Sequence, residues 1–430
     1  MIDSARRLVL AASVVTVIET TADTGPEYLE TATSQDPLSQ GFKVLRLPYS
    51  EERHTLLNLR TFYMDRDLDS QLDARDWAAG GSLTMVTDFW QDRIKLGATG
   101  YTSQKIWSDD NTLSTGLLQP DGDSYSSLGE IYANVTLDKL AVQAGRFLVN
   151  MPYINASDSR MTPNTFQGVD IVYQFNDQWT VGGGVLTDIK RRTSTDFVSL
   201  YEAAGIEGNE GNEDVKIVAT LYQFEPGTSA GIYYMLAPDF IHGTYAEASR
   251  RFTLDSNRYV QLSAQYTRQE PEGAKLAGDI DAEQYGLRAT WKHSWYSGSL
   301  AWTDYPDENR IRSPWGSIPG YTSVMIRDFN RPEETAWLLG GSADLSHWGM
   351  KGLKINVKYT EGDTPDCGAS ASPDQNEWDL NLDYSPPQPV LAGLGLRLRL
   401  GRVEQQDSCI GQDARDVTDI RLILNYAFAL

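Results

Sequence analysis

From Thr55 onward, the chain is a succession of short stretches in which apolar and polar residues alternate. Because successive side chains of a β-strand point to opposite faces, each stretch predicts a strand with one apolar and one polar face. Short and long connections alternate between about eighteen such stretches, a pattern typical of an outer-membrane barrel. Strands are expected at 55–64, 79–90, 92–104, 125–137, 139–149, 167–175, 178–188, 215–225, 229–236, 240–253, 258–270, 282–293, 296–303, 333–346, 350–361, 375–385, 394–405 and 418–428. The expected fold is all-β: a single antiparallel transmembrane β-barrel.

Charged residues on the polar faces indicate what the barrel encloses. In GLGLRLRLGR, Arg397 and Arg399 share a face that excludes the neighbouring leucines. A soluble β-sandwich also alternates, but its polar face meets bulk water and rarely carries arginine at two successive positions. If the apolar face meets lipid, the charged face lines an aqueous lumen.

The composition agrees with this interpretation. Mean hydropathy is only −0.41, and no run reaches the roughly eighteen apolar residues of a spanning helix. A barrel escapes that requirement because only every second residue of a strand touches lipid. The net charge of −22 argues against nucleic acid as a partner.

The N-terminal part differs from the rest of the chain. Two arginines precede an apolar run from Leu8 to Ile18, which has the length of a signal-peptide core and is too short to span a bilayer. We expect a signal peptide over 1–22, an aperiodic entry segment over 23–53 and the barrel over 54–430. The barrel uses the whole remaining length, so no further domain boundary is expected.

Two cysteines and four histidines are present. Cys367 and Cys409 fall in expected long loops that flank the same hairpin, so a disulfide on the oxidising outer side is expected, with two separate thiols as the alternative. These residues show no metal-ligand spacing. We therefore expect no metal and no cofactor.

The connection from Asn150 to Phe166, NMPYINASDSRMTPNTF, holds the most specific local motif. Its polar cluster consists of Ser157, Asp158, Ser159 and Arg160, and Pro163 follows it. This pattern resembles the constriction loop of the OprD-like family of substrate-specific porins. Further resemblance lies in RDFNRPEETAW, NEWDLNLDY, GLRLRLGR and DIRLILNY, which keep the family's order.

The resemblance implies an outer-membrane channel of a Gram-negative bacterium, surrounded by lipid and lipopolysaccharide, whose loop narrows the pore. We expect passive transport through a monomeric pore, because no nucleotide-binding motif is present. Long polar connections are often functional, although this loop alone also fits an ordinary surface turn.

A basic track is expected on the inner wall, where it would bind carboxylate groups by bidentate contacts. Its members are Arg60, Arg288, Lys354, Lys358, Arg397, Arg399 and Arg421. The alternative for any one of them is that it extends to the headgroup zone. For Arg397 and Arg399 that alternative is weaker, because a cation facing lipid near the midplane costs about 2–4 kcal/mol.

An acidic wall is expected beside the track. Glu377, Asp379 and Asp383 alternate inward on the strand next to the two arginines, and opposed charges create a transverse field that orders a dipolar solute. They also fit a role as structural ion-pair partners. Arg146 shares parity with apolar neighbours, which requires either a bulge or a position outside the lumen.

The substrate class stays open between two branches of the family. RDFNRPEETAW and PWGSIPGYTSVMI resemble the branch that takes benzoate-type and other cyclic or aromatic carboxylates, and basic amino acids or peptides are the alternative. From other classes, an outer-membrane hydrolase would need a nucleophile and a base that the sequence does not show. A structural or adhesive barrel would need no basic track. A soluble all-β binding protein would not partition into membranes.

Overall fold

The computed structural model describes residues 54–68, 73–87, 90, 93–109, 113–206, 214–276, 278–406 and 416–430. The expected signal peptide (1–22) and entry segment (23–53) lie outside the described residues and stay predictions.

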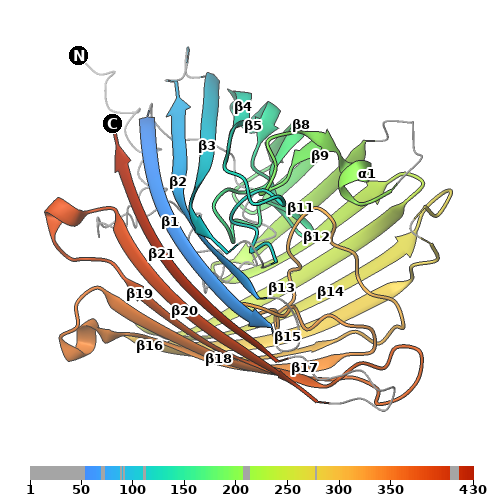
Figure 1. The fold of residues 1–430 in the computed structure, drawn as a ribbon. Coiled ribbons are helices and arrows are strands. Elements are labelled where there is room, and N and C mark those ends of the chain that lie inside the picture. The colour runs from blue at the N-terminus through green and yellow to red at the C-terminus, as the bar shows by residue number, and fades with distance from the viewer. Residues whose placement is uncertain are drawn as a thin grey trace, which may run out of the picture.

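Eighteen strands form a closed antiparallel barrel (Figure 1), as the sequence predicts. The wall strands are β1 (His54–Leu68), β2 (Ala74–Val86), β3 (Ile94–Ser108), β4 (Tyr125–Leu137), β5 (Leu140–Phe147), β8 (Thr165–Gln174), β9 (Trp179–Lys190), β11 (Val215–Glu225), β12 (Thr228–Ala237), β13 (Ile241–Asp255), β14 (Arg258–Pro271), β15 (Ala282–His293), β16 (Tyr296–Asp304), β17 (Thr335–Asp344), β18 (Leu353–Asp363), β19 (Gln375–Tyr384), β20 (Leu394–Gln405) and β21 (Val417–Ala429). Each expected stretch overlaps one of these strands, with ends that differ by at most five residues. Consecutive strands pair, and β1 pairs with β21 to close the barrel, so the wall has no free edge.

Several short elements supplement the eighteen wall strands, and one of them, β10 (Val198–Ser199), pairs with the end of β9. The others are β6 (Asn150–Met151), β7 (Ile154–Asn155), α1 (Leu200–Ala203) and the 3-10 turns η3 (Leu345–Trp348) and η4 (Pro389–Leu391). The sequence does not predict these short elements, because two to four residues are too few for a periodic pattern. The described residues include no helix long and apolar enough to cross a membrane.

The alternation of side chains produces the two faces of the wall. On β19, Trp378 is 52% exposed on the outer face, whereas Glu377 and Asp379 beside it are 1% and 3% exposed on the inner face. Arg146 lies on the outer face, because it pairs directly with the outward Ile131 and no bulge interrupts β5. Its guanidinium lies 4.1 Å from the centroid of the Phe197 ring. Of the two alternatives for Arg146, the position outside the lumen is therefore correct.

The long connections lie at one end of the barrel. One connection at that same end is short, because only residues 238–240 join β12 to β13. Neighbouring segments bond this short turn: the Tyr201 hydroxyl donates to the carbonyl of Pro238, and the amide of Ala274 donates to the Asp239 carboxylate.

Two long connections fold into the barrel and pack together. The first, between β5 and β8 (residues 148–164), forms the small β6–β7 hairpin, and the second joins β16 to β17 (residues 305–334). Ile154 of the first makes a parallel bridge with Trp315 of the second. Trp315 is fully buried and donates its indole N–H to the carbonyl of Leu200 at 2.7 Å. These contacts create an apolar core inside one half of the barrel.

The pairing of β1 and β2 depends on glycine at position 81, where φ is +139° and an added Cβ would lie 1.8 Å from the carbonyl oxygen of Asn58. We expect Gly81→Val to lower stability by about 1–3 kcal/mol or more, because the two strands would have to separate. Heat-modified migration of the folded barrel on gels measures this. Gly395→Ala is the matched control, since nothing lies within 4 Å of its added Cβ. Equal melting temperatures of the two variants would contradict the claim that the pairing of β1 and β2 requires glycine at position 81.

Candidate functional site

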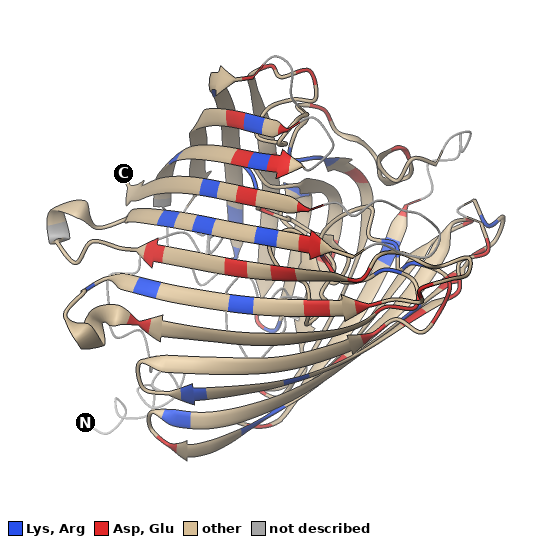
Figure 2. Ribbon diagram, turned by 60° about the horizontal axis from the view of Figure 1, so that its bottom comes forward, with Lys and Arg blue, Asp and Glu red and all other residues tan. Residues whose placement is uncertain are grey.

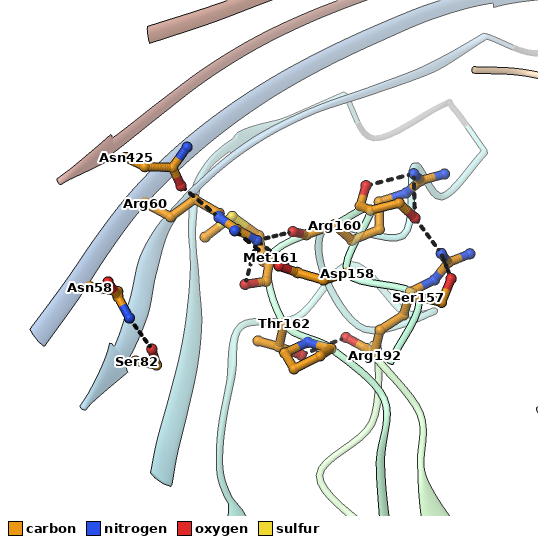
Figure 3. A network of polar contacts seen from close by, with 12 residues as sticks. Asn58, Arg60, Ser82, Ser157, Asp158, Arg160, Met161, Thr162, Arg192 and Asn425 are labelled. Carbon is orange, nitrogen blue, oxygen red and sulfur yellow. Dashed lines mark hydrogen bonds and ion pairs between the residues drawn. The ribbon is translucent and has the colours of Figure 1, made fainter. Parts of the chain in front are cut away.

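The loop of residues 148–164 is fixed to the barrel wall by an ion pair between Arg60 and Asp158 (Figure 3). Arg60 Nη1 lies 2.9 Å from Asp158 Oδ1, and Nη2 donates to Oδ2 at 3.2 Å, so the contact is bidentate. Arg60 also donates to Asn425 Oδ1 at 2.9 Å and to the carbonyl of Arg160 at 2.6 Å. The side chains of Arg60 and Asp158 are only 11% and 5% exposed. This arrangement holds the polar cluster of the loop inside the lumen.

Ser157 and Ser159 face an arginine that was not predicted from the sequence. Arg192, just beyond the end of β9, donates to Ser159 Oγ at 2.7 Å and to Ser157 Oγ at 3.4 Å (Figure 3). Ser157 adopts φ +44°, a left-handed conformation that is uncommon for a residue with a side chain and is often found at functional loops. The only indication of Arg192 in the sequence is the pair Arg191-Arg192 after a predicted strand, but such a pair fits an exposed loop equally well.

Arg160 completes the cluster. Its Nε donates to the carbonyl of Thr115 at 2.7 Å, and Nη1 donates to the carbonyl of Ser159 at 2.9 Å. Burial, together with the neighbouring guanidiniums of Arg421 and Arg192, lowers the pKa of Arg160 well below its ordinary value. Burial and the guanidiniums of Arg421 and Arg66 likewise lower the pKa of Arg192. The loop and the facing wall therefore concentrate positive charge at one place.

The facing wall carries charges in cross-strand rows, and Figure 2 shows bands of both signs on neighbouring strands. One row joins Lys354, Asp383 and Arg397. The next joins Asn381, Arg399 and Arg421. The third joins Lys358, Asp379, Gly401, Asp419 and Arg66. Cross-strand pairs of opposite charge stabilise neighbouring strands, whereas the like-charged pair of Arg399 and Arg421 is unfavourable without a counter-charge.

Arg421 is paired with Asp419 on the same strand. Arg421 Nε lies 2.8 Å from Asp419 Oδ1, and Arg66 Nη2 lies 2.6 Å from Asp419 Oδ2. Asp419 and Arg66 are not among the site residues predicted from the sequence. The inward position of Asp419 could have been predicted from the sequence, because Asp419 stands two positions before Arg421 on the same strand and therefore shares its face.

Arg399 differs from the other arginines of this wall. Its Nε donates to the neutral Asn381 Oδ1 at 2.6 Å, whereas Arg397 is paired with the Asp383 carboxylate. Within the described part of the chain, no carboxylate lies within ion-pair distance of Arg399, and its side chain is only partly buried. Arg399 therefore offers a guanidinium that forms no ion pair with a described carboxylate.

The remaining members of the expected track also lie on the inner face. Lys354 and Lys358 stand directly opposite Asp383 and Asp379 in the register of β18 and β19. Arg288 lies apart from them on β15, with its guanidinium 4.2 Å from the centroid of the Tyr321 ring.

Glu377 and Asp379 are covered by the loop of residues 305–334. The amides of Ile326 and Arg327 donate to the two oxygens of Glu377 at 2.7 and 2.8 Å, and the amide of Met325 donates to Asp379 Oδ2 at 3.0 Å. Both oxygens of Glu377 and one oxygen of Asp379 thus accept backbone amides, whereas Asp379 Oδ1 is buried without a hydrogen-bond partner among the described residues. Only Asp383 of the expected acidic wall is half-exposed, at 27% of its side chain.

The expected disulfide falls partly outside the described residues. Cys367 lies in the connection between β18 and β19, and Cys409 lies outside the described residues, so their pairing stays a prediction. No group of three His, Cys, Asp or Glu residues that is suited to a metal ion occurs within the described ranges.

The arrangement of an inward loop against a charged wall matches a known family. The model of the outer membrane porin, OprD family, matches residues 48–430. The chain belongs to the OprD family. Porin D of Pseudomonas aeruginosa is 26% identical over 354 residues, which cover 78% of this chain and 79% of that protein.

Solved structures share the fold of this OprD-family porin. OccK9 (OpdG) of Pseudomonas aeruginosa has a TM-score of 0.79 at 23% identity and covers 88% of this chain and 98% of its own. OpdK with vanillate, from the same organism, has a TM-score of 0.77 at 20% identity and covers 88% of this chain and 99% of its own.

Family membership confirms the general expectations. The porin is an integral β-barrel of the outer membrane of a Gram-negative bacterium and a substrate-specific passive channel. It is not an enzyme, so the hydrolase alternative is wrong, and so are the adhesive-barrel and soluble-protein alternatives.

Removing the charge of Asp158 tests the attachment of the loop. Breaking one side of a buried ion pair costs about 3–5 kcal/mol, so we expect Asp158→Asn to release the loop and to increase both single-channel conductance and current noise. Planar-bilayer recordings measure this. Asp138→Asn, in the exposed β4–β5 turn at φ +52°, is the control, because asparagine tolerates that conformation. Unchanged conductance in Asp158→Asn would show that the ion pair does not hold the constriction.

Proposed function

We propose that this porin takes up small carboxylate-bearing solutes, chiefly cyclic or aromatic carboxylates, by passive diffusion through a monomeric pore. Outer-membrane lipid and lipopolysaccharide would surround the apolar outer face. The observation that supports this proposal most strongly is a group of arginines whose guanidiniums donate to neutral acceptors. They are Arg160, Arg192 and Arg399.

Electrostatics explains why such a group favours an anion. Arg160 and Arg192 donate to hydroxyl and carbonyl oxygens, and their lowered pKa values reflect repulsion from neighbouring guanidiniums in addition to burial. A carboxylate that enters this place relieves the repulsion. It also gains bidentate hydrogen bonds that replace its lost hydration.

The wall offers successive positions for the same carboxylate. Arg397 and Arg399 are two residues apart on one strand, which separates their Cα atoms by about 6.6 Å, and Arg421 stands directly opposite Arg399. A solute passes from one guanidinium to the next without returning to bulk water between them. Conduction requires that no single contact be too strong, and the bonds of these arginines to Asn381, Asp383 and Asp419 moderate each one.

The occupied acidic wall favours carboxylates over basic amino acids. A basic amino acid carries a cation that needs a carboxylate partner in the pore, but Glu377 and Asp379 already accept backbone amides and are almost fully buried. The solved OpdK structure holds vanillate, an aromatic carboxylate, which supports the same choice. Basic amino acids remain the second candidate through the half-exposed Asp383.

Competition for uptake tests the proposal. In proteoliposomes that contain the porin, unlabelled benzoate should reduce the entry of labelled benzoate more strongly than equimolar arginine does. Stronger competition by arginine would favour the second candidate.

Replacing Arg399 tests whether its guanidinium binds the carboxylate of the solute. We expect Arg399→Gln to slow benzoate uptake about five- to tenfold, as the loss of one charged hydrogen-bonding group of about 1–1.5 kcal/mol predicts, and to shift the reversal potential in a salt gradient toward cations. Arg402→Gln is the matched control, because Arg402 lies three residues further on the outer face and is 55% exposed. Equal benzoate uptake by the two variants would show that Arg399 does not bind the solute during passage.

A further inference from the structure

The loop of residues 305–334 crosses the lumen between two attachments. At one side, the Tyr321 hydroxyl donates to Glu247 Oε1 on β13 at 2.7 Å, and the Arg288 guanidinium covers the Tyr321 ring. At the other side, the tip formed by Met325, Ile326 and Arg327 docks on β19. The position of the tip is therefore fixed from both ends.

The docking of the tip uses polar groups on both partners. Three successive amides donate to the carboxylates of Glu377 and Asp379, and Arg421 Nη2 donates to the carbonyl of Met325 at 3.2 Å. Hydrogen bonds to buried carboxylates are stronger than neutral ones and are well defined in direction. The backbone of the tip is thus bonded to the same wall that carries the arginines.

The side chains of the tip lie above Gly401. A Cβ at position 401 would lie 2.4 Å from Met325 Cε and 2.9 Å from Ile326 Cδ1. Gly401 follows Arg399 by two positions and so shares its inward face, and Arg399 stands opposite Arg421. Both tip side chains are only partly buried. An apolar surface therefore borders the guanidiniums of Arg399 and Arg421.

We propose that Met325 and Ile326 determine specificity by contacting the apolar ring of a solute whose carboxylate is bound by Arg399. Glu377 and Asp379 act as positioning residues that hold these two side chains in place. This inference rests on the proposed function and names the part of the pore that recognises the uncharged end of the substrate.

The chemistry of the two surfaces defines the solute class. A ring gains by leaving water against Met325 and Ile326. A short aliphatic carboxylate such as acetate gains only the contacts to arginine. An extended solute with a cationic end would place that charge against an apolar surface, which is unfavourable. The tip therefore selects a compact apolar group next to the carboxylate.

The experiment compares uptake of benzoate and acetate in proteoliposomes. In Met325→Ala/Ile326→Ala, we expect the ratio of benzoate to acetate uptake to fall roughly three- to tenfold, as expected from the loss of several methylene contacts, while acetate uptake is maintained or rises. Met325→Gln, which keeps nearly the same volume, should lower the ratio in the same direction. An unchanged ratio in both folded variants would overturn the inference.

A second pair of variants tests the positioning role. Glu377→Gln/Asp379→Asn should lower the same ratio and increase conductance, because the tip loses its charged acceptors. Glu361→Gln, on the outer face of the adjacent strand β18, removes a carboxylate of the same kind and should change neither quantity. A ratio that stays at the wild-type value in Glu377→Gln/Asp379→Asn would show that Glu377 and Asp379 do not position Met325 and Ile326.

The wild-type porin separates failure of this inference from failure of the proposed function. If wild-type uptake of benzoate is inhibited more by arginine than by benzoate, the proposed function fails. If wild-type uptake prefers benzoate and the tip variants retain the wild-type ratio, the proposed function stands and the role of Met325 and Ile326 fails.

Discussion

The buried ion pair between Arg60 and Asp158 is the contact on which the arrangement of the pore depends. Arg60 belongs to β1, the strand that closes the barrel against β21, and Asp158 belongs to a loop that begins after β5. A buried charge is tolerated only when it is paired and hydrogen-bonded. The bidentate geometry and the further bonds of Arg60 to Asn425 and to the loop backbone meet that requirement. The loop is thereby held across the lumen.

The two inward loops divide the interior into halves of different character. Along β9 to β13, wall residues such as Tyr233 and Tyr245 pack with Tyr153, Trp315 and other loop residues into an apolar core. Along β18 to β21, the wall carries the charged rows. The proposed solute path therefore runs beside the charged wall. Under the proposed function, the same packing that stabilises the loops also determines which arginines a solute meets.

The strands were predictable because each depends on a local property. A strand between lipid and lumen must alternate, so eighteen elements and the faces of Arg397, Arg399, Glu377 and Asp379 follow from parity alone. Parity also shows that Arg146 is exceptional, and the outer position of its side chain agrees with its apolar neighbours.

The partners within the lumen were not predictable in the same way. Arg192 follows β9 in a loop without periodicity, and its contact with Ser159 joins residues 33 positions apart. The sequence placed Glu377 and Asp379 on the inner face but did not indicate that a loop more than fifty residues away would occupy them, as the 54-residue separation of Met325 and Asp379 requires. Such contacts depend on how long loops fold inside a closed barrel, which residue type and spacing do not encode.

A crystal structure of the porin with 4-bromobenzoate would test the central claim most directly, because the anomalous signal of bromine locates the ring independently of the carboxylate. The account predicts the carboxylate at Arg399 and the bromine beside Met325 and Ile326. A bromobenzoate bound instead at Arg288, or no ordered bromine at a concentration that saturates uptake, would contradict it.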